Sequence, residues 1–194
     1  MVKTRIAVLV SGGGTNLQAL LDAQAAGKIP HGEIALVVSN KEGAYALTRA
    51  ENFGIKHAVI TGKDFEARLQ QTLEENGIEM IVLAGFMKIL SGDFTGQWPD
   101  RILNIHPALI PSFCGEGYYG LRVHEEALRY GVKVTGATVH FVNEIPDGGK
   151  IIAQKAVEIQ EGDTPEVLQR RVMERAEWIL LPQAVELVAE QLCR

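Results

Sequence analysis

Short apolar runs alternate with helical segments through the first half of the chain, and this alternation restricts the fold more than any other feature. The run at 6–10 is apolar throughout, as is typical of a strand buried on both faces. Gly54 and Gly77 follow two of the helical segments, where helix ends favour glycine. This spacing predicts βαβ units and a parallel sheet. The strands are expected at 6–10, 34–38, 58–60 and 80–84, and the helices from 15, at 44–53 and at 64–76.

The second half has a different pattern. A short strand at 102–105 leads into His106 and Pro107, and the aperiodic stretch 108–121 predicts a long loop. A helix is expected at 123–130. Two further strands, at 132–142 and 151–159, are separated by a turn sequence at 146–149.

A long helix is predicted at the C-terminal end of the sequence. Thr164 suits its N-cap and Pro165 its first position, whereas Pro182 should kink the helix or split it. We find no repeat, linker or low-complexity segment. We therefore predict a single domain over residues 1–194, with residues 1–100 as a phosphate-binding half and residues 101–194 as a catalytic half.

Composition and charge exclude several classes of protein. Hydrophobic residues are 46% and charged residues 22% of the 194 residues, which excludes a disordered chain. The net charge is −5, with no basic block, which argues against a nucleic-acid partner. The longest apolar stretch, 80–87, is far shorter than the roughly 20 residues of a membrane span. Residues 1–5 show no signal-peptide pattern. We expect a cytoplasmic protein with no nucleic-acid or membrane partner.

Three consecutive glycines, 12–14, separate the first strand from the first helix. Glycines allow the backbone to approach an anion, and the free N–H groups of a helix start point towards it. The loop therefore indicates phosphate or carboxylate binding, with a plain tight turn as the alternative. It is not a P-loop, because no lysine follows, and Leu17 occupies the position of the third glycine of a dinucleotide fingerprint.

Asn104 and His106 lie at the carboxyl end of a predicted strand, where open α/β sheets bind ligands. Strand alternation places both on the same side. An amide and an imidazole can both donate to a carbonyl oxygen that becomes an oxyanion. Asp147, in the later turn, could reach the imidazole and favour its protonated form. His140 either lines this site or is a satisfied strand histidine. No residue set has zinc-ligand spacing, so no metal is predicted.

These motifs together resemble the folate-dependent formyltransferase family, and within it the phosphoribosylglycinamide formyltransferases, over essentially the whole chain. The resemblance implies an α/β fold: a single-domain, Rossmann-like three-layer sandwich whose mostly parallel sheet has an antiparallel C-terminal portion. It is carried by the segments 11–17 (SGGGTNL), 83–90 (LAGFMKIL), 104–113 (NIHPALIPSF), 138–142 (TVHFV) and 147–149 (DGG).

The resemblance also implies an activity. The family transfers the formyl group of 10-formyltetrahydrofolate, a co-substrate, to the amine of glycinamide ribonucleotide in purine (IMP) biosynthesis. It places Asn104, His106 and Asp147 as the catalytic trio, and His140 remains a possible site-lining residue. The positions expected to bind the ribonucleotide are Gly14, Thr15, Asn16 and Glu177. Those expected to bind the folate are Lys63, Met87, Lys88, Ile89, Leu90, Asn104, Asn143, Glu144, Ile145, Pro146 and Asp147, with Arg68 as the alternative to Lys63 for the basic residue.

Two departures from the family pattern are visible. Trp178 stands where the family usually has histidine, and the loop at 114–120 is longer than in the commoner pattern. The alternative function is formyltetrahydrofolate hydrolysis, in which water replaces the amine. That enzyme usually has an additional N-terminal domain, for which there is no room before Ile6. A non-catalytic folate or phosphate sensor is a further alternative, and it would not need the trio. Monomer and homodimer both remain open.

Overall fold

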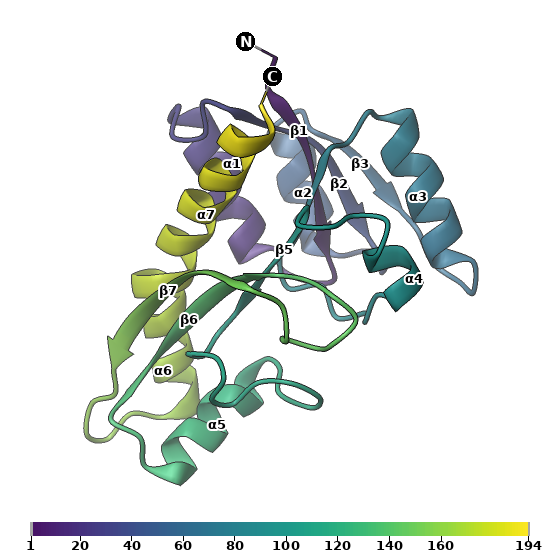
Figure 1. Cartoon of the computed structure of the whole chain (residues 1–194). Helices are drawn as coiled ribbons and strands as arrows, with labels where there is room; N and C mark the ends of the chain where they lie inside the picture. Colours follow the sequence, from purple (N-terminus) through teal and green to yellow (C-terminus); the bar gives the residue numbers. More distant parts are fainter. Residues whose placement is uncertain (1, 194) are drawn as a thin grey trace.

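A single seven-stranded sheet runs through residues 2–193, the part of the chain that the computed structural model describes (Figure 1). Its strand order is β3-β2-β1-β4-β5-β6-β7. The strands β1 to β5 are parallel, whereas β6 is antiparallel to β5 and to β7. The predicted fold is therefore confirmed. The strands are β1 Thr4–Val10, β2 Gly32–Ser39, β3 Lys56–Val59, β4 Met80–Leu83, β5 Ile102–His106, β6 Val134–Phe141 and β7 Ile151–Glu158.

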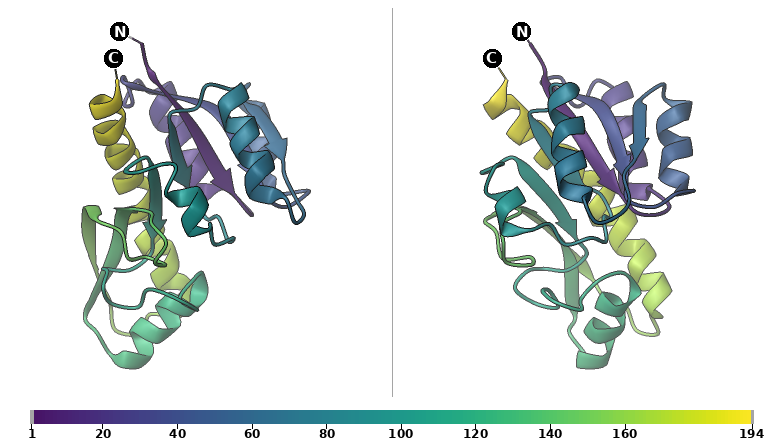
Figure 2. Two further views of the ribbon diagram at one scale, coloured as in Figure 1. Left: turned by 45° about the vertical axis from the view of Figure 1, so that its right-hand side comes forward. Right: turned by 90° about the vertical axis from the view of Figure 1, so that its right-hand side faces the viewer.

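Helices cover both faces of this sheet, because the central strands are apolar on both sides (Figure 2). On β1, Ile6 and Val8 join one hydrophobic core, while Ala7 and Leu9 join the other, as strand alternation requires. The first core is covered by α1 Thr15–Ala25, α2 Tyr45–Asn52, α6 Pro165–Val172 and α7 Trp178–Leu192. The second is covered by α3 Phe65–Glu75 and α4 Gly92–Thr95. The helix α5 Leu121–Tyr130 packs beside α6.

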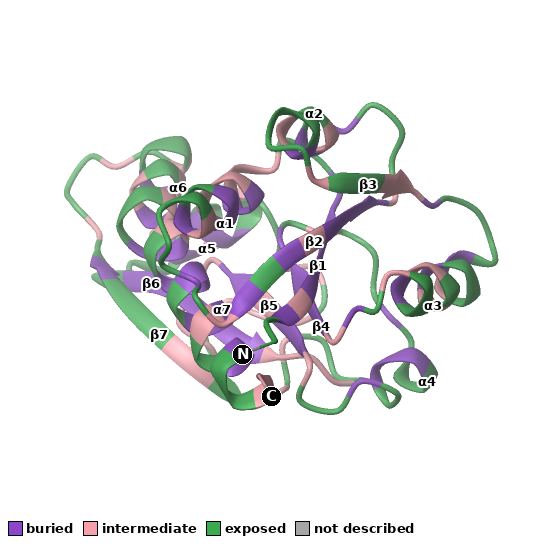
Figure 3. Cartoon of the chain, turned by 90° about the horizontal axis from the view of Figure 1, so that it is seen from above, coloured by how far each residue is buried: buried purple, intermediate pink, exposed green. Residues whose placement is uncertain are grey.

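Burial follows this layering (Figure 3). The central strands β1 and β4 are almost wholly buried, whereas the edge strand β7 is largely exposed. Among the helices of residues 2–193, none has the length and apolar character needed to cross a membrane.

The C-terminal helix differs from its prediction. It is interrupted, but at a π-helical turn, Met173–Glu177, rather than at Pro182, which lies inside α7. The π-helical turn contains hydrogen bonds that span five residues instead of four, and such turns are frequent at functional sites. The short helix α4 was not predicted from the sequence, although Ser91 caps it by accepting a hydrogen bond from the backbone N–H of Phe94 at 3.2 Å.

The strand order determines where a ligand can bind. Because the order reverses between β1 and β4, the carboxyl ends of β1, β4 and β5 meet at one edge, which is where open α/β sheets bind ligands. The glycine loop follows β1, the segment 85–91 follows β4, and His106 ends β5. Strands lie about 4.8 Å apart, so β1 and β5 are separated by roughly 10 Å. This separation fits a small substrate between the glycine loop and His106.

Candidate active site

Asp147 lies at the centre of a cluster of polar side chains at the carboxyl end of β5. Its Oδ2 is 3.5 Å from Nδ1 of His106, and its Oδ1 accepts a hydrogen bond from Nδ2 of Asn104 at 3.4 Å. Asn104 and His106 project from the same side of β5, as alternation predicted. The structure therefore brings together the three residues expected to form the catalytic trio.

His140 is a fourth member of this cluster. It lies directly opposite Asn104 in the β5–β6 ladder. Its Nδ1 is 2.8 Å from the carbonyl oxygen of Phe141, so Nδ1 carries a proton and donates it to that oxygen. Asn104 Nδ2 lies 3.1 Å from that Nε2, and Asp147 Oδ1 lies 3.4 Å from it. Of the two interpretations left open for His140, the structure favours the one in which it lines the site.

Two backbone groups of the loop at 108–120 complete the cluster. The carbonyl oxygen of Phe113 is 2.8 Å from Nε2 of His106, and the N–H of Gly115 donates to Asp147 Oδ2 at 2.9 Å. Phe113 therefore fixes the proton of a neutral His106 on Nε2 and leaves Nδ1 unprotonated towards Asp147. Sequence reasoning missed both contacts, because backbone groups leave no signature in the residue types.

The charges of the cluster differ from the sequence prediction in one respect. Burial lowers the pKa of His106, and this effect outweighs the carboxylate of Asp147 and the Phe113 carbonyl, which both raise it. His106 is thus neutral near pH 7 in the substrate-free protein, rather than kept charged by Asp147. Burial raises the pKa of Asp147, but the neighbouring histidines and the N–H of Gly115 lower it by a larger amount. The pKa therefore lies below its ordinary value, and the carboxyl remains ionised.

The glycine loop forms an open cradle at the start of α1. Gly14 occupies the N-cap position with φ +71°, in the left-handed region that favours glycine. A Cβ atom at Gly14 would approach the Cβ of Ala46 to 2.6 Å, whereas Cβ atoms at Gly12 and Gly13 would meet no atom within 4 Å. No side chain caps the first turn of α1, and that turn contains no acidic residue. Its free N–H groups are therefore available to an anion.

Asn16 and Glu177, two positions expected to bind the ribonucleotide, are in direct contact across 161 residues of sequence. Nδ2 of Asn16 donates to Oε2 of Glu177 at 2.6 Å. Glu177 ends the π-helical turn and is only 6% exposed. Burial raises its pKa to about 6, and the hydrogen bond from Asn16 lowers it only in part. Oδ1 of Asn16 is buried and has no partner within residues 2–193.

The positions expected to bind folate come from four parts of the chain: Lys63, the segment 87–90, Asn104 on β5 and the segment 143–147. Lys63 lines a cleft of about 500 Å³ together with Lys88, Ile89 and Leu90. Met87 precedes them and is 48% exposed. The segment 143–147 lies beside these residues, since a Cβ atom at Gly92 would be 3.3 Å from Cβ of Glu144. Asn143 accepts a hydrogen bond from the N–H of Ile145, and Ile145 and Pro146 are exposed next to Asp147.

Sequence reasoning also missed Ser11, whose hydroxyl donates to Asn40 at 2.7 Å and accepts from the N–H of Met87 at 2.8 Å. This hydroxyl joins the glycine loop to the segment after β4. Across the described residues 2–193, no three His, Cys, Asp or Glu side chains come together as a group that could hold a metal ion.

Comparison with known proteins agrees with this geometry. Residues 4–185 match the family model described as formyl transferase. The phosphoribosylglycinamide formyltransferase of Haemophilus influenzae is 42% identical over 96% of this chain and 87% of its own length. The solved glycinamide ribonucleotide transformylase 1 of Symbiobacterium toebii has a TM-score of 0.90 and 42% identity, covering 97% of this chain and 89% of that chain.

Some relatives are much longer. The trifunctional purine biosynthetic protein adenosine-3 of Gallus gallus is 48% identical over 96% of this chain, and the chain spans 18% of its length. The resemblance predicted from the sequence motifs is confirmed by these matches. This chain belongs to the formyl transferase family.

Proposed function

We propose that this chain transfers the formyl group of 10-formyltetrahydrofolate to the amine of glycinamide ribonucleotide. The observation that carries the proposal is the contact of one partly buried carboxylate, Asp147, with both Asn104 and His106 at the carboxyl edge of the sheet. The names of the relatives that match along most of their length support the same activity.

In the first step, the amine nitrogen of the ribonucleotide attacks the formyl carbon, and the carbonyl oxygen becomes an oxyanion. Nδ2 of Asn104 has two hydrogens. Because Nε2 of His140 and Oδ1 of Asp147 lie only 3.4 Å apart, one hydrogen can be shared between them. The other hydrogen can then donate to the oxyanion. A fixed donor at such a site typically contributes about 10²–10³ in rate.

The amine loses one proton as it becomes an amide, and the departing folate nitrogen gains one. The unprotonated Nδ1 of His106 faces Asp147 and can take up the proton from the amine. The resulting imidazolium is stabilised by the ionised Asp147 until the proton passes to the folate nitrogen as the carbon–nitrogen bond breaks. Acid–base assistance of this kind is typically worth about 10²–10⁴ in rate.

The two substrates approach this cluster from opposite sides. The ribonucleotide binds with its phosphate at Gly14, Thr15 and Asn16 and its remaining polar groups near Glu177. The folate binds along Lys63, the segment 87–90 and the segment 143–147. Because the formyl carbon and the amine must meet between them, much of the acceleration comes from positioning.

The activity is tested by following the absorbance of 10-formyltetrahydrofolate with and without glycinamide ribonucleotide. Turnover that requires the ribonucleotide, with one formyl group appearing on the amine for each folate consumed, is the expected result. Turnover at the same rate without the ribonucleotide would identify a hydrolase and refute the proposal. Binding of folate without turnover under either condition would point to a sensor and would refute it as well.

A further inference from the structure

Arg49 is a cationic side chain beside the glycine loop. It lies on α2, one turn after Ala46, whose N–H donates to the carbonyl oxygen of Gly12 at 3.0 Å. Its Nε donates to the carbonyl oxygen of Gly13 at 2.8 Å, and its Cδ lies 3.5 Å from the position of a Cβ at Gly14. The guanidinium is thus hydrogen-bonded to the glycine loop, where the phosphate of the substrate is proposed to bind.

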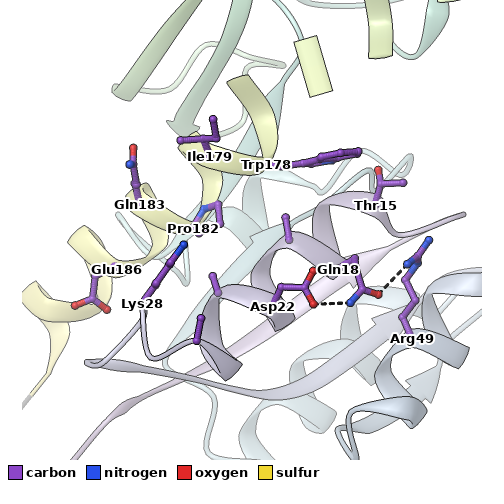
Figure 4. Close-up of a pocket in the computed structure, with 13 residues that line it drawn as sticks. Thr15, Gln18, Asp22, Lys28, Arg49, Trp178, Ile179, Pro182, Gln183 and Glu186 are labelled. Carbon is purple, nitrogen blue, oxygen red and sulfur yellow. Dashed lines mark hydrogen bonds between the residues drawn. The ribbon is translucent and has the colours of Figure 1, made fainter. Parts of the chain in front are cut away.

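The guanidinium is also held in a fixed orientation (Figure 4). Gln18 Oε1 accepts a hydrogen bond from Nη1 of Arg49 at 2.8 Å, and Nε2 of Gln18 donates to Asp22 at 2.8 Å. The carboxylate of Asp22 can only accept hydrogen bonds, so it binds the NH2 group of the Gln18 amide. The amide oxygen of Gln18 is therefore turned towards Arg49. The guanidinium carbon lies 5.0 Å from the ring centre of Tyr45, which covers one face.

These contacts leave part of the guanidinium free. Two of its five N–H donors are bound, those to Gly13 and Gln18. The remaining N–H groups of Nη1 and Nη2 have no hydrogen-bond acceptor within the described part of the chain. Arg49 and Thr15 lie at the same end of one pocket of about 770 Å³ between α1 and α7 (Figure 4). The free donors are therefore available beside the first turn of α1.

We infer that Arg49 binds the phosphate of the ribonucleotide, an inference that rests on the proposed function and adds a residue to its substrate site. A phosphate monoester carries a charge close to −2 at pH 7, which the partial charge of a helix N-terminus balances only in part. The other cation in the lining of the pocket is Lys28, three residues after the end of α1. Because α1 is roughly 16 Å long, Lys28 lies far from the first turn, where the phosphate is expected. In Figure 4 it lies beside Pro182, at the far end from Thr15.

The experiment compares substrates with and without the phosphate. Formyl transfer to glycinamide ribonucleotide and to glycinamide riboside is measured for the wild-type chain, Arg49→Gln, Arg49→Lys and the control Lys28→Gln. The preference for the ribonucleotide over the riboside, measured as the ratio of their kcat/KM values, should fall about 10- to 100-fold in Arg49→Gln. A fall of this size corresponds to the loss of one or two charge-assisted hydrogen bonds. Arg49→Lys should retain part of this preference, since lysine keeps the positive charge but lacks the paired N–H donors of the guanidinium. Lys28→Gln should retain the wild-type preference.

The inference is overturned if Arg49→Gln lowers kcat/KM equally for both substrates, because Arg49 would then only shape the glycine loop. An unchanged preference would overturn it as well. Calorimetry of ribose 5-phosphate binding gives a second measurement that needs no turnover, with at least tenfold weaker binding expected in Arg49→Gln. A wild-type chain that binds ribose 5-phosphate and transfers no formyl group would refute the proposed function alone, and the calorimetric comparison would still decide the role of Arg49.

Discussion

Glu177 is a carboxylate with almost no contact with water, and the structure predicts how its charge affects stability. Burial raises its pKa to about 6 from an ordinary value of 4.5, a difference that corresponds to about 2 kcal/mol. Because the folded-state pKa of this acid is raised, the unfolded chain releases the proton more readily. The protein therefore loses this stability as the pH rises from 4.5 through 6. Glu177→Gln, which has no charge, should be more stable than the wild type by about 2 kcal/mol above pH 6.

Urea denaturation between pH 5 and pH 8 measures this effect. With a slope of about 2 kcal/mol per molar urea, the midpoint of Glu177→Gln should lie about 1 M above the wild type at pH 7.5, and the gap should narrow towards pH 5. Glu174→Gln is a matched control, because Glu174 lies on the same π-helical turn but is exposed and paired with Arg170. Its midpoint should stay close to the wild type at every pH.

The same variant should bind the ribonucleotide more weakly, with little change in folate affinity. The reasoning fails if the difference in midpoint between Glu177→Gln and the wild type does not vary with pH, because a buried, charged Glu177 requires that variation. Greater stability without weaker ribonucleotide binding would leave the electrostatic argument intact and remove Glu177 from the substrate site.

Three further predictions concern the glycine loop, the cluster at β5 and a buried histidine. Gly14→Ala should destabilise the protein by at least about 1 kcal/mol in urea denaturation, because φ is +71° and the added Cβ meets α2, whereas Gly13→Ala, with open space around its Cβ, should stay within about 0.5 kcal/mol. Similar values for both would contradict the strain argument. Asp147→Asn should lower kcat at least about 10²-fold with small changes in either KM, and a near-normal kcat with an unchanged pH profile would exclude Asp147 from the proton transfer. His124 is fully buried without a partner for either ring nitrogen in residues 2–193, and burial lowers its pKa to about 4 from 6.5. The contribution of His124 to stability should therefore fall by up to about 3 kcal/mol as the pH drops from 6.5 to 4, against the opposite contribution of Glu177. The difference in stability between the wild type and His124→Leu should change by that amount over this range, whereas the difference between the wild type and the exposed control His57→Leu should stay nearly constant.

Much of the sheet could be predicted because continuous apolar runs and glycine-terminated helices are local signals. The position of Asn104 and His106 on one side of β5 followed from strand alternation alone. The approach of Asp147 required the loop between β6 and β7 to fold back over β5, which is a tertiary event. His140 was ambiguous for the same reason, since its contact with Asn104 depends on the register of the β5–β6 ladder.

The features that could not be predicted have weak or no side-chain signals. The carbonyl of Phe113 and the N–H of Gly115 act through the backbone, so any residue type could supply them. The π-helical turn at Met173–Glu177 inserts a wider turn into an otherwise helical pattern, and Pro182 is a stronger local signal for a break. Pro182 lies in the second turn of α7, which directly follows the π-helical turn, and the helix continues through it.

The neutral state of His106 bears directly on how the cluster favours the transition state over the bound substrates. If His106 were an imidazolium before the reaction began, it would already be paired with Asp147. Its charge would then stabilise the ground state as much as the transition state. Burial instead lowers the pKa of His106 and leaves the carboxylate with hydrogen bonds from Asn104 and Gly115. The imidazole then becomes charged only when the attacking amine releases its proton, which is when negative charge develops on the formyl oxygen. Only interactions that strengthen between ground state and transition state accelerate a reaction, so a buried, neutral histidine beside an ionised carboxylate is better suited to this transfer than a permanently charged pair.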